Sequence, residues 1–365
     1  MNLNTEKLHQ QGVSLWLDNI TRSMLQDGTL EEYIHDLSVT GLTSNPTIFD
    51  HAIANSGDYD EAIHRKSKTG KSGEALFLEL AIEDLSRAAD LFKPIYERTN
   101  GVDGWVSLEV SPLLAYDTDR TLQAAKGLFE RVGKPNLFIK IPGTPQGLSA
   151  IEEAIFSGVP VNVTLLFSAE QYKAAAQAYL RGIERRIRAG LNPDVRSVAS
   201  LFISRWDKAT MGQVSSSLQN KLGLAVAQRT YLAYHEILCS DRMLRAMNGG
   251  ARPQRLLWAS TGTKDPQASD ILYIRALVAP YTINTMPEET LKAFADHGEL
   301  RTSLSVENVQ AHEVFADFEL AGFEYEKMAD KLQHEGASAF VKSWNGLLES
   351  IVSKATEMQA SRNDA

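Results

Sequence analysis

Residues 136–167, NLFIKIPGTPQGLSAIEEAIFSGVPVNVTLLF, decide the fold. Two short apolar runs, Leu137–Ile141 and Val159–Leu165, are bounded by turn residues, which predicts buried strands. Between them, Gln146–Phe156 has apolar residues at helical spacing and is typical of an amphipathic helix. A strand, a helix and a second strand in this order predict a βαβ unit with parallel strands.

The same alternation continues on both sides of this unit. The predicted strands are Val13–Leu17, Val39–Thr43, Trp105–Val110, Leu137–Ile141, Val159–Leu165, Val198–Ile203, Leu256–Ser260 and Tyr281–Asn284. The predicted helices are Glu74–Phe92, Asp119–Arg131, Gln146–Phe156, Ala169–Ala189, Leu222–Cys239 and Pro287–Phe294. About eight such units favour an α/β fold of the closed (β/α)8 TIM barrel type. A doubly wound open sheet is the alternative, because periodicity alone does not show closure.

Two stretches depart from the repeat. Residues 50–73 are polar and rich in Gly, Ser and Lys, and we interpret them as an insertion after the second strand, whose role the sequence leaves open. Residues 305–354 are predicted to be a helical extension with an apolar stripe at Trp344, Leu347, Leu348 and Ile351. We expect it to pack on the barrel exterior or across one end. No shift in composition marks a second domain, so residues 1–365 are predicted to form a single barrel domain.

The composition indicates an ordinary globular protein. The 365 residues are 43% hydrophobic and 23% charged, which is close to the globular norm and argues against a disordered chain. The net charge of −9 disfavours a nucleic-acid binder, although a local basic pocket for an anionic substrate is compatible with it. The N-terminal residues 1–10 are polar, and no run approaches the ~18 apolar residues of a membrane helix. We therefore expect a cytoplasmic protein without a membrane partner.

Motifs for cofactors and metals are absent from the sequence. There is no GxGxxG, GxxxxGK[ST], HExxH or CxxC, so we expect neither a cofactor nor a metal. The GKSG at 70–73 is interpreted as a flexible turn. The single cysteine, Cys239, excludes an intramolecular disulfide, and its helical spacing predicts a buried structural thiol.

Charged residues interrupt the apolar runs near their ends. Asp18 ends the first run, Glu109 lies late in the third and Lys140 late in the fourth, while Asn162 and Thr164 share one face of the fifth. Active sites of barrels are assembled at this level. A buried lysine has a lowered pKa that frees its amine to attack a carbonyl, and a neighbouring acid can shuttle the protons of imine formation. The alternatives are structural: Asp18 as a helix cap, and Glu109 with Lys140 as a buried ion pair.

A second group of residues suits an anionic substrate. Arg205 follows the sixth strand, and a guanidinium matches the geometry of a phosphate. Ser260 and Lys264 follow the seventh strand, and the loop at this place is a common phosphate site in barrels. Taken alone, Arg205 is more typical of an exposed residue at the start of a helix, and Ser260 and Lys264 nearby shift the balance towards phosphate binding.

Three of these segments together resemble the transaldolase family. Residues 43–46 (TSNP) are similar to its T-[ST]-N-P signature, and residues 138–142 (FIKIP) to the segment that carries the Schiff-base lysine. Residues 162–168 (NVTLLFS) resemble its N-[VL]-T-L-[LI]-F-S signature. The resemblance extends from about Ser14 to Leu291 and points to the larger bacterial and plant-type branch.

The resemblance implies a cofactor-independent transferase of the pentose phosphate pathway. It would move a dihydroxyacetone unit from sedoheptulose 7-phosphate to glyceraldehyde 3-phosphate, giving erythrose 4-phosphate and fructose 6-phosphate. Its partners would be phosphorylated ketoses and aldoses, and the chain would be a monomer or a homodimer. Lys140 would attack the ketose C2 carbonyl, Glu109 would act as acid and base through a water, and Asp18 would remove the C4 hydroxyl proton. The implied substrate-binding residues are Thr43, Asn45, Asn162, Thr164 (which would hold the water), Ser200, Phe202 (which would exclude bulk water), Arg205, Ser260 and Lys264.

One position departs from the family pattern. Many transaldolases have an arginine two residues after the serine that matches Ser260, and here that residue is Gly262. We predict that Lys264 supplies the missing charge. Two alternatives remain: a simple aldolase, a lyase of the fructose 6-phosphate type that tends to carry Tyr at position 202 and Gln at 109, and a non-catalytic barrel that binds a sugar phosphate. The Phe202 and Glu109 of this sequence favour group transfer.

Overall fold

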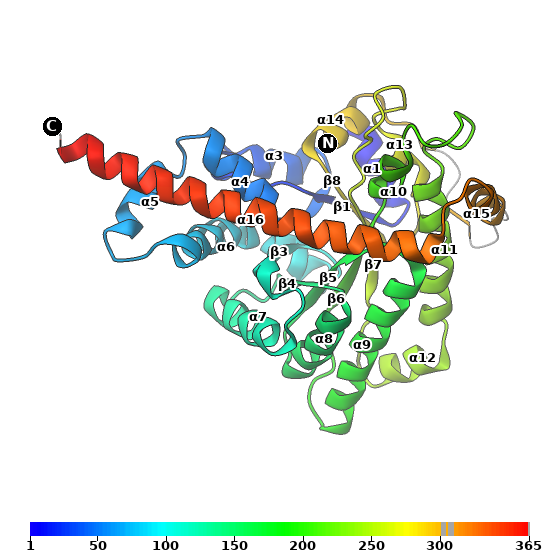
Figure 1. Cartoon of the computed structure of the whole chain (residues 1–365). Helices are drawn as coiled ribbons and strands as arrows, with labels where there is room; N and C mark the ends of the chain where they lie inside the picture. The colour runs from blue at the N-terminus through cyan, green and yellow to red at the C-terminus, as the bar shows by residue number, and fades with distance from the viewer. Residues whose placement is uncertain (301–303, 306–309, 364–365) are drawn as a thin grey trace.

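Parallel strands close into a barrel surrounded by helices in the computed structural model, which describes residues 1–300, 304–305 and 310–363 (Figure 1). Each strand pairs with the next along the chain, and the last pairs with the first. The strands are β1 (Val13–Leu17), β2 (Val39–Thr43), β3 (Trp105–Glu109), β4 (Leu137–Pro142), β5 (Val161–Leu166), β6 (Ser197–Phe202), β7 (Arg255–Ala259) and β8 (Thr282–Met286). The predicted TIM barrel is confirmed, and the open sheet is excluded.

Helices follow the strands and form the outer layer. They are α1 (Leu3–Gln10), α2 (Arg22–Gln26), α3 (Thr29–Asp36), α4 (Pro46–Asn55), α5 (Asp60–Ser67), α6 (Gly73–Arg98), the 3₁₀ turn η1 (Pro112–Leu114), α7 (Thr118–Val132), α8 (Pro145–Ser157), α9 (Ala169–Arg188), α10 (Ser204–Thr210), α11 (Leu222–Leu238), α12 (Asp241–Asn248), α13 (Leu272–Ala276), α14 (Glu288–His297), α15 (Gln310–Leu320) and α16 (Tyr325–Asn363). Several begin where a polar side chain accepts a hydrogen bond from a free N–H of the first turn. Asn45, Asp117, Thr144 and Ser168 cap α4, α7, α8 and α9 in this way.

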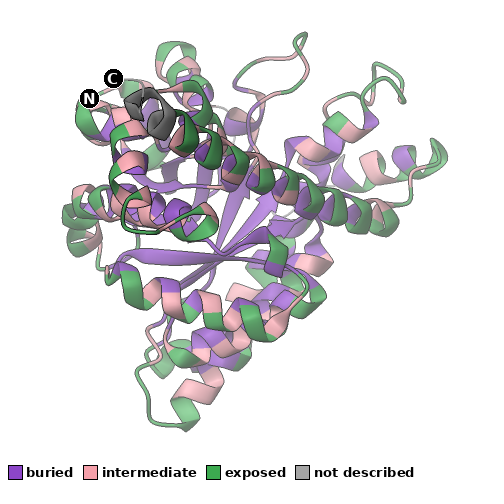
Figure 2. Ribbon diagram, turned by 60° about the vertical axis from the view of Figure 1, so that its left-hand side comes forward, coloured by how far each residue is buried: buried purple, intermediate pink, exposed green. Residues whose placement is uncertain are grey.

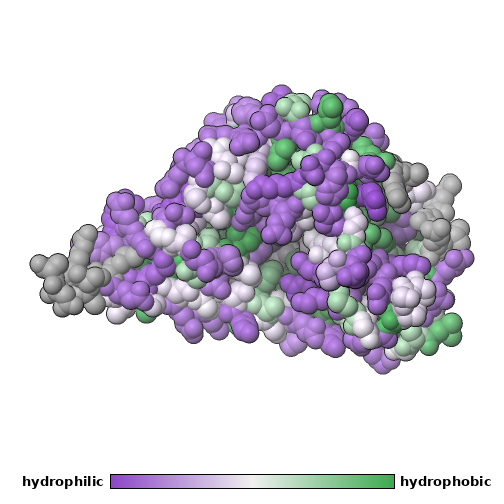
Figure 3. Space-filling model, turned by 90° about the horizontal axis from the view of Figure 1, so that it is seen from above, coloured by the Kyte–Doolittle hydropathy of each residue, from purple (hydrophilic) through white to green (hydrophobic). Residues whose placement is uncertain are grey.

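Burial follows this layered arrangement. The strands are buried along their whole length, and the surrounding helices alternate buried inner and exposed outer residues (Figure 2). On the face seen in Figure 3, hydrophilic residues predominate and hydrophobic ones form small separate patches. Among the described residues, no helix combines the length and apolar character needed to span a bilayer.

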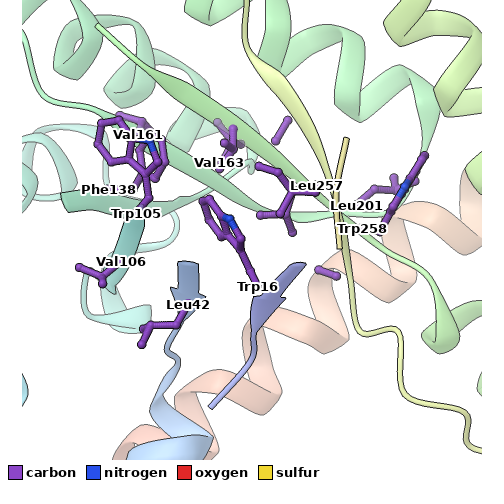
Figure 4. Packing of buried hydrophobic residues seen from close by; sticks show 14 of the residues in the cluster. Trp16, Leu42, Trp105, Val106, Phe138, Val161, Val163, Leu201, Leu257 and Trp258 are labelled. Atoms are coloured by element: carbon purple, nitrogen blue, oxygen red, sulfur yellow. The ribbon is translucent and has the colours of Figure 1, made fainter. Parts of the chain in front are cut away.

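Aromatic side chains fill the barrel interior below the ends of the strands. Trp105 and Phe138 stack with ring centroids 4.0 Å apart, and Trp16 lies 6.2 Å from Phe138 (Figure 4). Gly41 leaves room for Trp16, because a Cβ at position 41 would lie 2.7 Å from the indole. Side chains alternate along a strand, so Lys140 lies on the same face as Phe138, one layer higher. The polar side chains at the strand ends therefore have an apolar floor.

The extra C-terminal helix is present and lies across the barrel (Figure 1). Its residues Trp344, Leu347 and Ile351 are buried, as the apolar stripe predicted. It packs on α4, α5 and α6 and reaches the end of β5, so it crosses the carboxyl ends of the strands. Of the predicted extension 305–354, residues 306–309 lie outside the described residues.

The polar segment 50–73 is largely helical. It contains the end of α4 and all of α5, and Ile53, Tyr59 and Ile63 are fully buried. Lys354 of α16 donates to Asp60 at 2.7 Å, which ties the segment to the C-terminal helix. These few apolar residues anchor helices whose other faces are polar.

The prediction of a buried Cys239 was wrong. The thiol is exposed, because Cys239 is the C-terminal capping residue of α11 and lies beyond the face that packs on the barrel.

Candidate active site

A cavity of ≈290 Å³ opens at the carboxyl ends of the strands. Most of its lining residues come from strand ends or from the loops that follow them, and one comes from α16. They are Asp18, Thr43, Asn45, Thr47, Ile48, Lys140, Thr164, Ser200, Phe202, Arg205, Ala259, Ser260, Gly262, Lys264, Thr285, Pro287 and Phe340. Ten of the twelve residues singled out in the sequence line this cavity; the other two, Glu109 and Asn162, lie directly beside Lys140 in the neighbouring strands.

Lys140 and Glu109 form a buried ion pair. They are register partners on β4 and β3, and Lys140 Nζ lies 3.4 Å from Glu109 Oε2. Lys140 Nζ also donates to the Ser44 carbonyl at 3.1 Å. Burial raises the pKa of the Glu109 carboxyl from 4.5 to about 7, although the Lys140 ammonium opposes the rise. Glu109 can therefore give and take a proton near neutral pH.

Asp18 lies just after β1 at the wall of the cavity. Thr43 Oγ1 is 2.8 Å from Asp18 Oδ1 and 2.7 Å from Thr285 Oγ1, so neighbouring strands on both sides orient the carboxylate. Burial raises the pKa of Asp18, and Lys140 and Thr43 act in the opposite direction. A raised pKa makes the ionised carboxylate a stronger base.

A chain of polar side chains runs across β3, β5 and β6. Asn162 donates to Ser107 at 3.1 Å and accepts from the Ser200 hydroxyl at 2.7 Å. Asn162 and Ser200 are buried, and these bonds fix their orientation towards the interior. Asn45 uses its side-chain oxygen to cap α4, at 3.1 Å from the Ile48 N–H, which leaves its amide N–H groups for another acceptor.

Three buried oxygens beside Lys140 accept or donate no hydrogen bond among the described residues. They are Thr164 Oγ1 and the two carboxyl oxygens of Glu109. Buried polar groups in native proteins are almost always hydrogen-bonded, so such atoms point to a place where a water or a substrate hydroxyl binds.

Hydroxyl groups and cations gather on the opposite side of the cavity. The hydroxyls of Ser204 and Ser260 are 2.9 Å apart, and Ser260 has a left-handed backbone (φ 54°). Arg205 and Lys264 line the same wall. Burial lowers the pKa of Arg205, and desolvation together with repulsion by Arg205 and Lys208 lowers that of Lys264. Cations that lie close together and repel one another favour the binding of an anion between them.

Lys264 lies close to the space that a side chain at position 262 would occupy. A Cβ on Gly262 would be 3.5 Å from Lys264 Nζ. The absent side chain at 262 therefore gives the Lys264 ammonium room at the cavity wall.

Two aromatic residues line the cavity. Phe202 is buried, lies 5.3 Å from Phe167 between ring centroids and has the Arg205 guanidinium 6.0 Å from its ring. Phe340 comes from α16 and is also buried. The sequence analysis missed Phe340, although it stands four residues before Trp344 and so continues the predicted apolar stripe.

No group of three or more His, Cys, Asp or Glu side chains gathers as metal ligands would in the part of the chain that the structure describes.

Comparisons with known proteins agree on one family. A family model described as Transaldolase/Fructose-6-phosphate aldolase matches residues 15–351. The protein named "Transaldolase" from Saccharopolyspora erythraea is 44% identical over 96% of this chain and 97% of its own. Those from Thermobifida fusca and Mycolicibacterium smegmatis, also named "Transaldolase", are 43% and 42% identical, each over 95% of this chain and 96% of its own.

Proposed function

The chain belongs to the transaldolase/fructose-6-phosphate aldolase family, and we propose that it is a transaldolase. It moves a dihydroxyacetone unit from sedoheptulose 7-phosphate to glyceraldehyde 3-phosphate and so yields erythrose 4-phosphate and fructose 6-phosphate, reversibly. The observation that carries the proposal is that Lys140, which lines the cavity together with Asp18, is paired in the interior with Glu109 of the neighbouring strand.

The first step forms an imine on Lys140. The neutral amine attacks C2 of the ketose, and the resulting carbinolamine loses its hydroxyl as water to give an iminium ion. Glu109, with its pKa of about 7, protonates the departing hydroxyl through a water that Thr164 Oγ1 holds.

The second step breaks the C3–C4 bond. Asp18 takes the proton of the C4 hydroxyl, the bond electrons pass into the iminium as C3–C4 breaks, and an aldose phosphate leaves. The three retained carbons stay on Lys140 as an enamine, whose hydroxyl groups meet Asn45, Asn162 and Ser200. The acceptor aldehyde enters, and the same groups run the steps in reverse.

Retention of the enamine requires a dry cavity. Phe202 and Phe340 keep bulk water from it, because protonation of the enamine at C3 followed by hydrolysis would release free dihydroxyacetone. The sugar phosphate lies against Arg205, Ser260 and Lys264, where Lys264 supplies the charge that the glycine at 262 lacks.

A transfer assay tests this proposal against the lyase alternative. Purified chain is given fructose 6-phosphate with and without erythrose 4-phosphate. A transaldolase turns over continuously to sedoheptulose 7-phosphate and glyceraldehyde 3-phosphate only when the acceptor is present; without it, at most one equivalent of glyceraldehyde 3-phosphate per active site is released. Sustained release of free dihydroxyacetone without the acceptor would mean a simple aldolase, and no turnover in either case would favour a sugar-phosphate-binding barrel.

A further inference from the structure

A buried amide from α16 enters the barrel end next to the site. Gln333 is buried, and its Nε2 donates to the Gly143 carbonyl at 3.1 Å and to the Leu165 carbonyl at 2.9 Å. Gly143 directly follows β4, and Leu165 lies within β5. One side chain, far away in the sequence, thus joins the carboxyl ends of two neighbouring strands.

The Leu165 carbonyl needs this partner because β5 is irregular there. Between Val163 and Leu166 the pairing of β5 with β6 shifts by one residue, which is a β-bulge. Leu165 has a left-handed backbone (φ 59°), which is rare for a bulky residue and persists only where the surroundings enforce it. The left-handed turn takes the Leu165 carbonyl out of the ladder, and a buried carbonyl without a donor is costly.

Thr164 lies within this irregular stretch, directly before Leu165. The Thr164 carbonyl accepts a hydrogen bond from the Gly143 N–H at 2.7 Å. The carbonyls of Gly143 and Leu165 both accept from Gln333, so the backbone of these two strand ends and the Gln333 amide form one hydrogen-bond network. The Thr164 side chain lines the cavity, and its buried hydroxyl has no hydrogen-bond partner among the residues that the structure describes. Bulges beside active sites re-aim side chains in this way.

The helix is held close to this bulge. Gly336, one turn after Gln333, has no Cβ, and a Cβ there would lie 3.0 Å from Leu165 Cδ2. Phe340, one further turn along the same face, lines the cavity.

We propose that Gln333 is a positioning residue for imine formation: its amide holds the Leu165 bulge so that Thr164 Oγ1 presents the proton-relaying water to the carbinolamine on Lys140. The inference rests on the proposed function. It assigns the C-terminal helix a part in the chemistry as well as in covering the cavity.

The test compares Gln333→Met, which keeps the length of the side chain and removes both donors, with Thr164→Val and with the double variant. The rate at which fructose 6-phosphate becomes trapped on Lys140 by borohydride is measured by rapid quenching, together with KM and the urea midpoint. Q333M is expected to slow trapping at least about tenfold with KM changed less than about twofold, because small displacements of a catalytic group cost rate. If Gln333 acts through Thr164, adding Q333M to T164V should slow trapping little beyond the effect of T164V alone.

Lys354→Met is the matched control, since it removes two hydrogen bonds of α16 to Ser56 and Asp60 far from β5. It should trap at the wild-type rate per folded molecule. The inference is overturned if Q333M traps at the wild-type rate, if its effect adds in full to that of T164V, or if K354M slows trapping equally. If Q333M does not fold, Gln333→Glu keeps the volume, loses a donor and is judged by the same comparisons. Wild-type chain that forms no adduct would overturn the proposed function itself.

Discussion

Lys140 Nζ lies 3.4 Å from Glu109 Oε2, and the two side chains are only 5% and 4% exposed. They face each other because they are register partners on adjacent parallel strands. A buried pair is costly unless hydrogen bonds satisfy its remaining atoms, and neither oxygen of Glu109 accepts one from the described part of the chain. The pair therefore contributes little to stability, and its geometry is better explained by the imine chemistry.

The free energy of unfolding should depend on pH in a way that reflects the raised pKa of Glu109. Between its ordinary pKa of 4.5 and about 7, the folded chain keeps a proton that the unfolded chain releases, so the free energy of unfolding falls as pH rises. This group contributes at most about 1.4 kcal/mol per pH unit. In urea denaturation, the free energy of unfolding of the wild type minus that of Glu109→Gln should decrease from pH 5 to 7 and then level off. A constant difference would show that Glu109 ionises normally and a rising one that its pKa is lowered, and either would contradict the raised pKa.

Asp18→Asn should stop the reaction after the imine has formed. The variant keeps Lys140 and Glu109 but lacks the base for the C4 hydroxyl, so we expect turnover to fall about 10²- to 10⁴-fold. Borohydride with fructose 6-phosphate alone should trap the intact six-carbon sugar phosphate on the protein, where the wild type gives a three-carbon adduct. Asp90→Asn, an exposed carboxylate paired with Lys134, serves as control and should behave as wild type. A three-carbon adduct formed by D18N at the wild-type rate would remove Asp18 from the mechanism.

Lys264→Ala should weaken binding of the sugar phosphate without impairing the chemistry. Loss of one charge-assisted hydrogen bond predicts a KM for fructose 6-phosphate raised about tenfold, with kcat changed less than about twofold. Lys208→Ala removes an exposed neighbouring cation that does not line the cavity, and its KM should stay close to that of the wild type. An unchanged KM in K264A would leave Arg205 as the cation that binds the phosphate.

The barrel and the polar residues at its strand ends could be predicted because both depend on local sequence patterns. Strand ends were placed within about two residues by apolar runs and turn residues, and parallel pairing then brings polar residues late in each strand to one edge. Asp18, Glu109 and Lys140 interrupt otherwise apolar runs, which is why the sequence singled them out.

The contacts of the C-terminal helix α16 with the site could not be predicted in the same way. Gln333 lies 168 residues from Leu165 along the chain, and a polar residue in a helix gives no sign of the carbonyl that it will meet. The run VNVTLL is equally apolar with or without a bulge, so the left-handed Leu165 leaves no local signal. Residues 50–73 looked like an insertion of polar turns because only a few apolar residues, such as Ile53 and Ile63, anchor helices that are otherwise polar.

Borohydride trapping of the wild-type chain with fructose 6-phosphate, without acceptor, followed by peptide mass mapping, tests the central claim most directly. We predict a reduced three-carbon adduct on Lys140, which is lost in Lys140→Met. A folded chain that forms no adduct, or one on a different lysine, would contradict the Schiff-base mechanism and leave Lys140 and Glu109 as a structural ion pair.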